Sequence, residues 1–137
     1  MDRVVIDPGV LISALLSPQG PPARLLLAWR AGSFELIVFS GLLAELEEVL
    51  LRPKFGHYVS AEEVHMYLEI LRREALVEPD PRSVEPGLTP DPDDDNLVAL
   101  AREAKAHFLV AGDPHLTALP DPDPPVLTPR AFLERLG

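Results

Sequence analysis

The sequence predicts an α/β protein, a three-layer sandwich in which helices cover both faces of a mostly parallel central sheet. Short apolar runs rich in β-branched residues alternate with amphipathic segments from one end of the chain to the other. Such alternation indicates parallel strand–helix units. At 137 residues the chain is long enough to bury a substantial core, and we expect one domain over residues 1–137.

The expected strands are short runs of branched and aromatic apolar residues. The first, "RVVID", has no alternating polar positions, which is typical of a strand buried on both faces. Strands are expected over residues 3–7, 34–40, 76–79, 107–113 and 125–128.

The expected helices show periodic apolar positions together with residues that begin or end helices. Ser60 and Glu63 form a capping box, Gly32 is suited to a helix C-terminus, and Pro129 to a first helical turn. The four prolines of residues 80–92 predict a loop. Helices are expected over residues 10–17, 23–32, 41–53, 60–75, 94–106 and 129–137.

Composition excludes several classes of protein and of site. A hydrophobic content of 47% against 25% charged residues is typical of a globular protein. The absence of cysteine excludes disulfides, thiolate zinc sites and cysteine nucleophiles, and it fits a reducing compartment. No basic leader precedes the first apolar stretch, and no run approaches the ~18 residues that span a bilayer. We therefore expect a cytoplasmic protein.

The net charge of −10 at pH 7 limits how the chain could bind nucleic acid. A protein that holds phosphates through surface charge alone would carry the opposite sign. Either nucleic acid is not the ligand, or metal ions mediate the contact.

Acidic side chains collect where strands are expected to end. Ligands of parallel sheets bind beyond the carboxyl ends of the strands. Mg²⁺ takes oxygen ligands and keeps several waters, so a few carboxylates suffice to hold it. The acids thus predict a divalent-cation site at this edge. They end two strands or lie early in the helices that follow, at Asp7, Glu45, Asp91, Asp93, Asp94, Asp95 and Asp113.

Each acid also has a purely structural explanation. Aspartates at a helix N-terminus complement its dipole, by ~0.3 to 1 kcal/mol each. Asp7 begins "DPG", a good turn in its own right. On the wheel of residues 41–53, Glu45 and Glu47 flank the apolar arc equally while Glu48 points away, so the periodicity leaves the first two open.

The ordered motifs resemble the PIN-domain family. They are Asp7 followed by "VLISALLS", then "LLAELEEVLLRPKF", "DPDDDNLVALA" and "FLVAGD". The chain is most similar to VapC-like ribonucleases, the toxin components of toxin–antitoxin systems. The resemblance implies a PIN-like fold and hydrolysis of RNA with Mg²⁺ or Mn²⁺ as the cofactor.

The resemblance also assigns residues and partners. The family's metal-binding and catalytic acids match Asp7, Glu45, Asp95 and Asp113, with Asp93 as a further metal ligand. A cognate antitoxin protein is expected to bind across the acidic edge. The apolar segments at residues 25–29 and 68–76 suit a homodimer face, although core packing explains them equally well.

Three positions depart from the family pattern. Gly9 stands where the family commonly has Asn, Ala111 where it has Thr or Ser, and His115 where a further acid is often seen. Loss of side chains that orient metal ligands typically costs ~10- to 100-fold in affinity or activity. The alternatives to a ribonuclease are therefore a catalytically weak or inactive metal- or RNA-binding module, and a metal-dependent phosphoesterase acting on another substrate.

Overall fold

A parallel β-sheet forms the centre of the computed structural model, which describes residues 1–79, 92–120 and 122–137, without the side chains of residues 92–96 and 115. The strands lie in the order β3-β2-β1-β4-β5, and every neighbouring pair is parallel. The predicted fold class is confirmed. The strands are β1 (Arg3–Ile6), β2 (Glu35–Phe39), β3 (Leu76–Glu78), β4 (Phe108–Val110) and β5 (Val126–Leu127).

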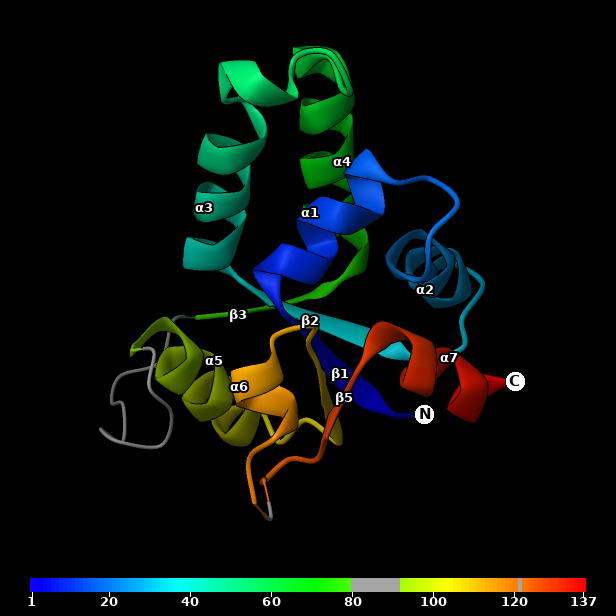
Figure 1. Cartoon of the computed structure of the whole chain (residues 1–137), viewed down its shortest axis with the longest axis vertical. Helices are drawn as coiled ribbons and strands as arrows, with labels where there is room; N and C mark the ends of the chain where they lie inside the picture. Colours follow the sequence, from blue (N-terminus) through cyan, green and yellow to red (C-terminus); the bar gives the residue numbers. More distant parts are fainter. Residues whose placement is uncertain (80–91, 121) are drawn as a thin grey trace.

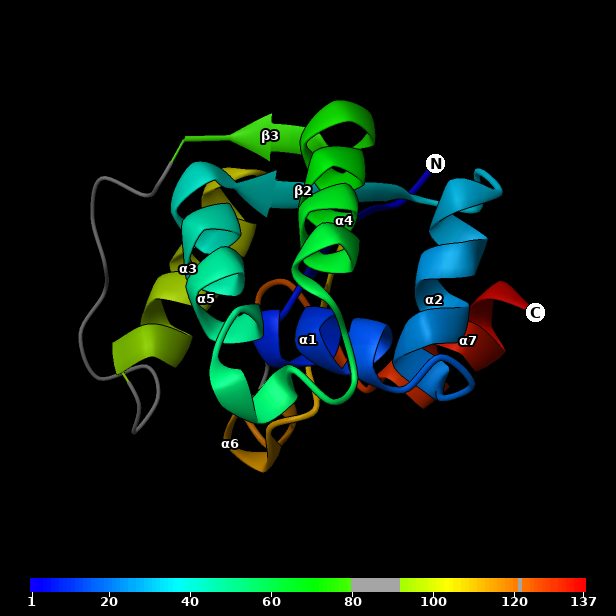
Figure 2. The ribbon, with the colours of Figure 1, turned by 90° about the horizontal axis from the view of Figure 1, so that it is seen from above.

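Helices cover both faces of this sheet. Figure 1 shows α1, α3 and α4 above the strands and α5 and α6 below them, while Figure 2 shows α2 beside α7. A short 3₁₀ turn, η1 (Pro53–Phe55), follows α3. The helices are α1 (Pro8–Leu16), α2 (Pro21–Arg30), α3 (Ser40–Leu50), α4 (Ala61–Glu74), α5 (Pro92–Glu103), α6 (Pro114–Thr117) and α7 (Pro129–Leu136).

The strand order contains a reversal between β1 and β4. The chain proceeds outward from β1 through β2 to β3, then returns to add β4 and β5 on the other side of β1. Because parallel crossovers are right-handed, the helices before and after the reversal fall on opposite faces. At such a switch point the two connections diverge, and a crevice opens beyond the carboxyl ends of the strands.

Side-chain contacts hold α7 against the sheet and α4 against α1. The Phe132 ring of α7 packs edge-on against Phe34, with centroids 5.2 Å apart, and lies 5.6 Å from the Phe108 ring. The Tyr67 hydroxyl of α4 donates a hydrogen bond to the Leu11 carbonyl oxygen of α1 at 2.8 Å. Burial raises the pKa of Tyr67, so its hydroxyl stays a neutral donor.

Most of the predicted elements are present, including the start of α4. There the Ser60 Oγ accepts from the Glu63 amide at 3.1 Å, and the Glu63 carboxylate accepts from the Ser60 amide at 3.0 Å. Gly32 follows the end of α2 with φ of +89°, the left-handed conformation for which glycine is suited. Local sequence signals therefore located these helix boundaries.

Several predicted boundaries differ from those observed, and two of the differences concern predicted site residues. The strand expected over residues 107–113 stops at Val110, so Asp113 lies in the connection before α6 rather than at the end of the strand. The helix expected from residue 94 begins at Pro92, whose fixed φ suits a first helical turn. Most of the loop predicted over residues 80–92 lies outside the described residues. Within the described ranges, no helix is both long and apolar enough to cross a membrane.

Candidate functional site

Asp7 lies at the junction of β1 and α1, next to the end of β4. Its amide donates to the Val110 carbonyl oxygen at 2.8 Å, which extends the pairing of β1 with β4 by one residue. Its side chain is the N-cap of α1 and accepts from the Gly9 amide at 3.2 Å. Strand pairing and helix capping together hold this carboxylate at the switch point.

Asp113 approaches Asp7 from the connection that follows β4, on the other side of the switch point. Two residues separate it from β4, and its carbonyl oxygen accepts from the Leu116 and Thr117 amides at 3.0 and 3.1 Å, which starts α6. Ala111 is fully buried and donates its amide to Leu127, so the connection leaves the sheet in a fixed direction. The side chain of Asp113 is half-buried, as is that of Asp7.

A small open cavity contains both aspartates, and we refer to it as the aspartate cavity. Its volume is about 230 Å³. Its walls come from α1, the start of α2, the connection after β4 and the start of α7. They are formed by Asp7, Gly9, Val10, Ser13, Pro22, Gly112, Asp113 and Pro129.

The electrostatics of this cavity disfavour two bare negative charges. Burial raises the pKa of Asp7 above its ordinary value, and the nearby Asp113 carboxylate acts in the same direction. The hydrogen bond from the Gly9 amide opposes them by stabilising the ionised form. A bound cation would relieve both unfavourable effects, and hard carboxylate oxygens are suitable ligands for Mg²⁺ or Mn²⁺. The two aspartates therefore fit such an ion.

The other predicted metal ligands belong to α3 and α5. Glu45 is exposed on the second turn of α3. Among the described side chains, no group of three acids or histidines is close enough to hold a metal ion. The structure thus brings Asp7 and Asp113 together without adding Glu45 to the pair.

Asp93 and Asp95 occupy the first turns of α5. Since α5 joins two parallel strands, it runs back along the sheet and begins on the side where the strands end. The side chains of Asp93 and Asp95, and that of His115 on α6, are outside the described set, as is Asp91 altogether.

The two other glutamates of α3 form ion pairs with arginines. The Glu47 carboxylate lies 3.7 Å from the Arg72 guanidinium of α4, and that of Glu48 lies 3.9 Å from Arg52. These ion pairs give Glu47 and Glu48 structural roles that the helical wheel could not assign.

Ser13 and Pro129 line the aspartate cavity and were not predicted from the sequence. Pro129 comes two residues after β5, so the rule that ligands bind beyond the carboxyl ends of parallel strands would also have indicated it. Ser13 had no comparable signal, because its position depends on the direction in which α1 leaves β1.

Comparison with known proteins gives one family and one relative. A family model described as a PIN domain matches residues 3–115, which include both aspartates of the cavity. An uncharacterized protein of Methanocaldococcus jannaschii is 28% identical over 145 aligned positions, covering 96% of this chain and 90% of that protein.

The raised pKa of Asp7 predicts a pH-dependent effect on stability in metal-free protein. The folded state holds this proton more tightly than the unfolded chain does, so stability falls as pH rises from the ordinary value of 3.8 through the folded pKa. In EDTA at neutral pH, Asp7→Asn should be more stable than the native chain, because Asn retains the capping acceptor without the charge. Below pH 3.8 the difference should vanish. Urea denaturation at both pH values measures it.

Asp7→Ala is the matched control, because it removes the capping acceptor along with the charge. Loss of the cap alone costs ~1 kcal/mol, so this variant should be less stable than Asp7→Asn at either pH. A native chain more stable than Asp7→Asn at neutral pH in EDTA would contradict the electrostatic account.

Proposed function

The chain belongs to the PIN-domain family, and on that premise we propose that it is a divalent-metal-dependent endoribonuclease, the toxin of a toxin–antitoxin pair. PIN domains are generally nucleases, which act by hydrolysis. The observation that carries the proposal is the juxtaposition of Asp7 and Asp113 in one cavity at the switch point of the sheet. We expect the enzyme to act in the cytoplasm, where its RNA substrate is found.

In this proposal, the chain's own residues hold and orient the ion. Asp7 and Asp113 are the central ligands, and Glu45, Asp93 and Asp95 contribute from α3 and α5. The Gly9 amide fixes one oxygen of Asp7 at 3.2 Å, so the carboxylate is oriented before any ion binds. When bound, Mg²⁺ or Mn²⁺ supplies an activated water at neutral pH and neutralises charge on the scissile phosphate. No side-chain nucleophile is needed, which agrees with a chain that has no cysteine.

The first test is cleavage of RNA by the purified chain with Mn²⁺ or Mg²⁺. Asp7→Asn, Asp113→Asn and Glu45→Gln should each lose more than the ~10- to 100-fold typical of residues that only support a ligand. Glu47→Gln is the matched control, because it removes a carboxylate two residues from Glu45 that already pairs with Arg72. EDTA should abolish cleavage by the native chain.

Thermal unfolding supplies a readout that does not depend on activity. An ion that binds only the folded state raises its stability by RT ln(1 + [ion]/Kd). Mn²⁺ should therefore raise the Tm of the native chain and not that of Asp7→Asn. Cleavage by Asp7→Asn at the native rate would refute the site, whereas Mn²⁺ binding without cleavage of any RNA would favour the non-catalytic module. Cleavage of DNA or small phosphate esters alone would favour the other phosphoesterase.

Gly9 suggests a variant that separates a weak enzyme from an inactive module. A Cβ added at Gly9 would lie 3.8 and 3.9 Å from the two carboxylate oxygens of Asp7, an ordinary contact distance. Gly9→Asn therefore fits, and its amide could donate to that carboxylate. We expect up to ~10-fold faster cleavage, within the range known for residues that orient metal ligands. Gly9→Ala is the control, and an equal gain in both variants would attribute the effect to helix propensity.

The proposed toxin role requires an antitoxin that covers the acidic edge. An antitoxin bound there would block access to the aspartate cavity. Growth arrest on expression of the native chain but not of Asp7→Asn, relieved by co-expression of such a protein, would support this role. Unaffected growth would restrict the proposal to the nuclease.

We also propose that a second copy of the chain docks in an apolar groove between α1, α2 and α4. The groove has a volume of about 340 Å³ and includes residues from both segments that suited a homodimer face, among them Leu27 and Ile70. Leu27 is 66% exposed at its rim. Arg30 of α2 and Glu63 of α4 line this groove, so a two-fold axis across it would bring opposite charges of the two copies together.

The oligomeric state tests the proposed dimer. Sedimentation should give a dimer for the native chain and a monomer for Leu27→Asp, because a buried unpaired charge opposes docking. Leu51→Asp, at a leucine 42% exposed outside the groove, should remain dimeric. A monomeric native chain at all concentrations would exclude the interface.

A further inference from the structure

Two arginines from distant parts of the chain line a second cavity, which we refer to as the arginine cavity. Arg24 belongs to α2 and Arg130 to α7, two helices that pack side by side in both views (Figures 1 and 2). The cavity has a volume of about 280 Å³, and its other walls are Pro21, Leu133 and Glu134. Two arginines against one glutamate give this cavity a net positive lining in a chain of net charge −10, which favours an anionic ligand.

The arginine cavity adjoins the aspartate cavity. Pro21 lines the former and Pro22 the latter, while Pro129 lines the latter and Arg130 the former. Consecutive residues on two helices thus separate the two cavities. The prolines have fixed φ and no amide hydrogen, so they offer an anion no donor. The guanidinium groups are the charged donors of the arginine cavity.

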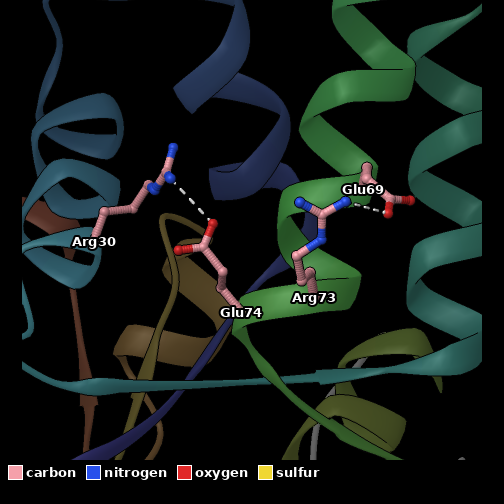
Figure 3. Close-up of polar contacts among 4 residues, drawn as sticks. All are labelled: Arg30, Glu69, Arg73 and Glu74. Carbon is pink, nitrogen blue, oxygen red and sulfur yellow. Dashed lines mark hydrogen bonds and ion pairs between the residues drawn. The ribbon is translucent and has the colours of Figure 1, made fainter.

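Most other basic side chains described in the structure already have partners. Arg30, at the opposite end of α2 from Pro21, pairs with Glu74 at 3.0 Å, and Arg73 pairs with Glu69 at 3.0 Å (Figure 3). Arg135 lies over the Phe108 ring at 4.4 Å. In the described part of the chain, neither Arg24 nor Arg130 forms an ion pair with a carboxylate, although Glu134 lines the same cavity.

We propose that Arg24 and Arg130 bind a phosphodiester of single-stranded RNA next to the one that is cleaved. The inference rests on the proposed nuclease and adds to it a subsite for a flanking phosphate. Guanidinium groups match phosphate oxygens in geometry and remain charged at every physiological pH. A positive groove beside a metal site would track the backbone of the strand without reading its bases. The subsite fixes the direction in which the strand crosses the aspartate cavity.

The subsite is tested by RNA binding in the Asp7→Asn background, which separates binding from cleavage. Fluorescence anisotropy with a short labelled single-stranded RNA would compare Asp7→Asn with and without Arg24→Ala and Arg130→Ala. We expect the double replacement to raise Kd about 10-fold or more, and to reduce the slope of log K against log salt by roughly 0.7 for each phosphate that the variant no longer neutralises. Glu134→Gln should lower Kd, because it removes a negative charge from the arginine cavity.

Arg72→Ala with Arg73→Ala is the matched control. It also removes two guanidinium groups, but from the end of α4 that leads into the start of β3, at the opposite edge of the sheet. This control should leave Kd and the salt slope close to those of the Asp7→Asn parent. Equal weakening by both double replacements, or no weakening by either, would overturn the subsite.

Two further comparisons show whether the proposed nuclease or the proposed subsite is wrong. A native chain that cleaves RNA while its Arg24 and Arg130 replacements leave binding unchanged would keep the nuclease and overturn the subsite. Absence of RNA binding in the native chain and in Asp7→Asn alike would overturn both. A single-stranded DNA of the same sequence should lose the same affinity on replacement of the arginines, because the phosphodiester is the shared ligand. Retention of DNA affinity would contradict binding through the phosphate.

Discussion

The pairing of β1 with β4 is the constraint on which the site depends. β1 is the first strand of the chain and β4 comes about a hundred residues later, yet they are neighbours in the sheet. The pairing continues past β1, through the hydrogen bond from the Asp7 amide to the Val110 carbonyl oxygen at 2.8 Å. This bond places the first carboxylate beside the connection that carries Asp113. If β4 added to the other edge of the sheet, the two aspartates would have no common cavity.

Asp7 serves the fold and the proposed chemistry in ways that partly conflict. As the N-cap of α1, its carboxylate satisfies the Gly9 amide and complements the helix dipole, which favours ionisation. Burial beside Asp113 disfavours the same ionised form, as its raised pKa indicates. A site built to receive a cation has this property, because the stabilisation that the metal-free protein lacks is recovered on binding.

The distribution of charge explains how an acidic chain could handle a polyanion. The aspartate cavity carries the charge that a metal ion would neutralise, and the arginine cavity beside it carries the charge that a phosphate requires. Arg24 and Arg30 belong to one helix, but only Arg24 reaches the arginine cavity, whereas Arg30 pairs with Glu74. Net charge alone conceals this local arrangement, since it sums residues from every face.

The sequence by itself determined the α/β class, most strands and helices, and the presence of aspartates just after the first and fourth strands. These properties depend on local periodicity, on capping residues such as Ser60, and on parallel strands ending at one edge. The tertiary structure alone decided the strand order, the proximity of Asp7 to Asp113, and the position of Arg24 and Arg130 in the lining of one cavity. It also gave Glu47 an ion pair with Arg72 of another helix, whereas the helical wheel treats Glu45 and Glu47 alike. Contacts between residues far apart in the sequence depend on how strands and helices pack, and no local pattern specifies that packing.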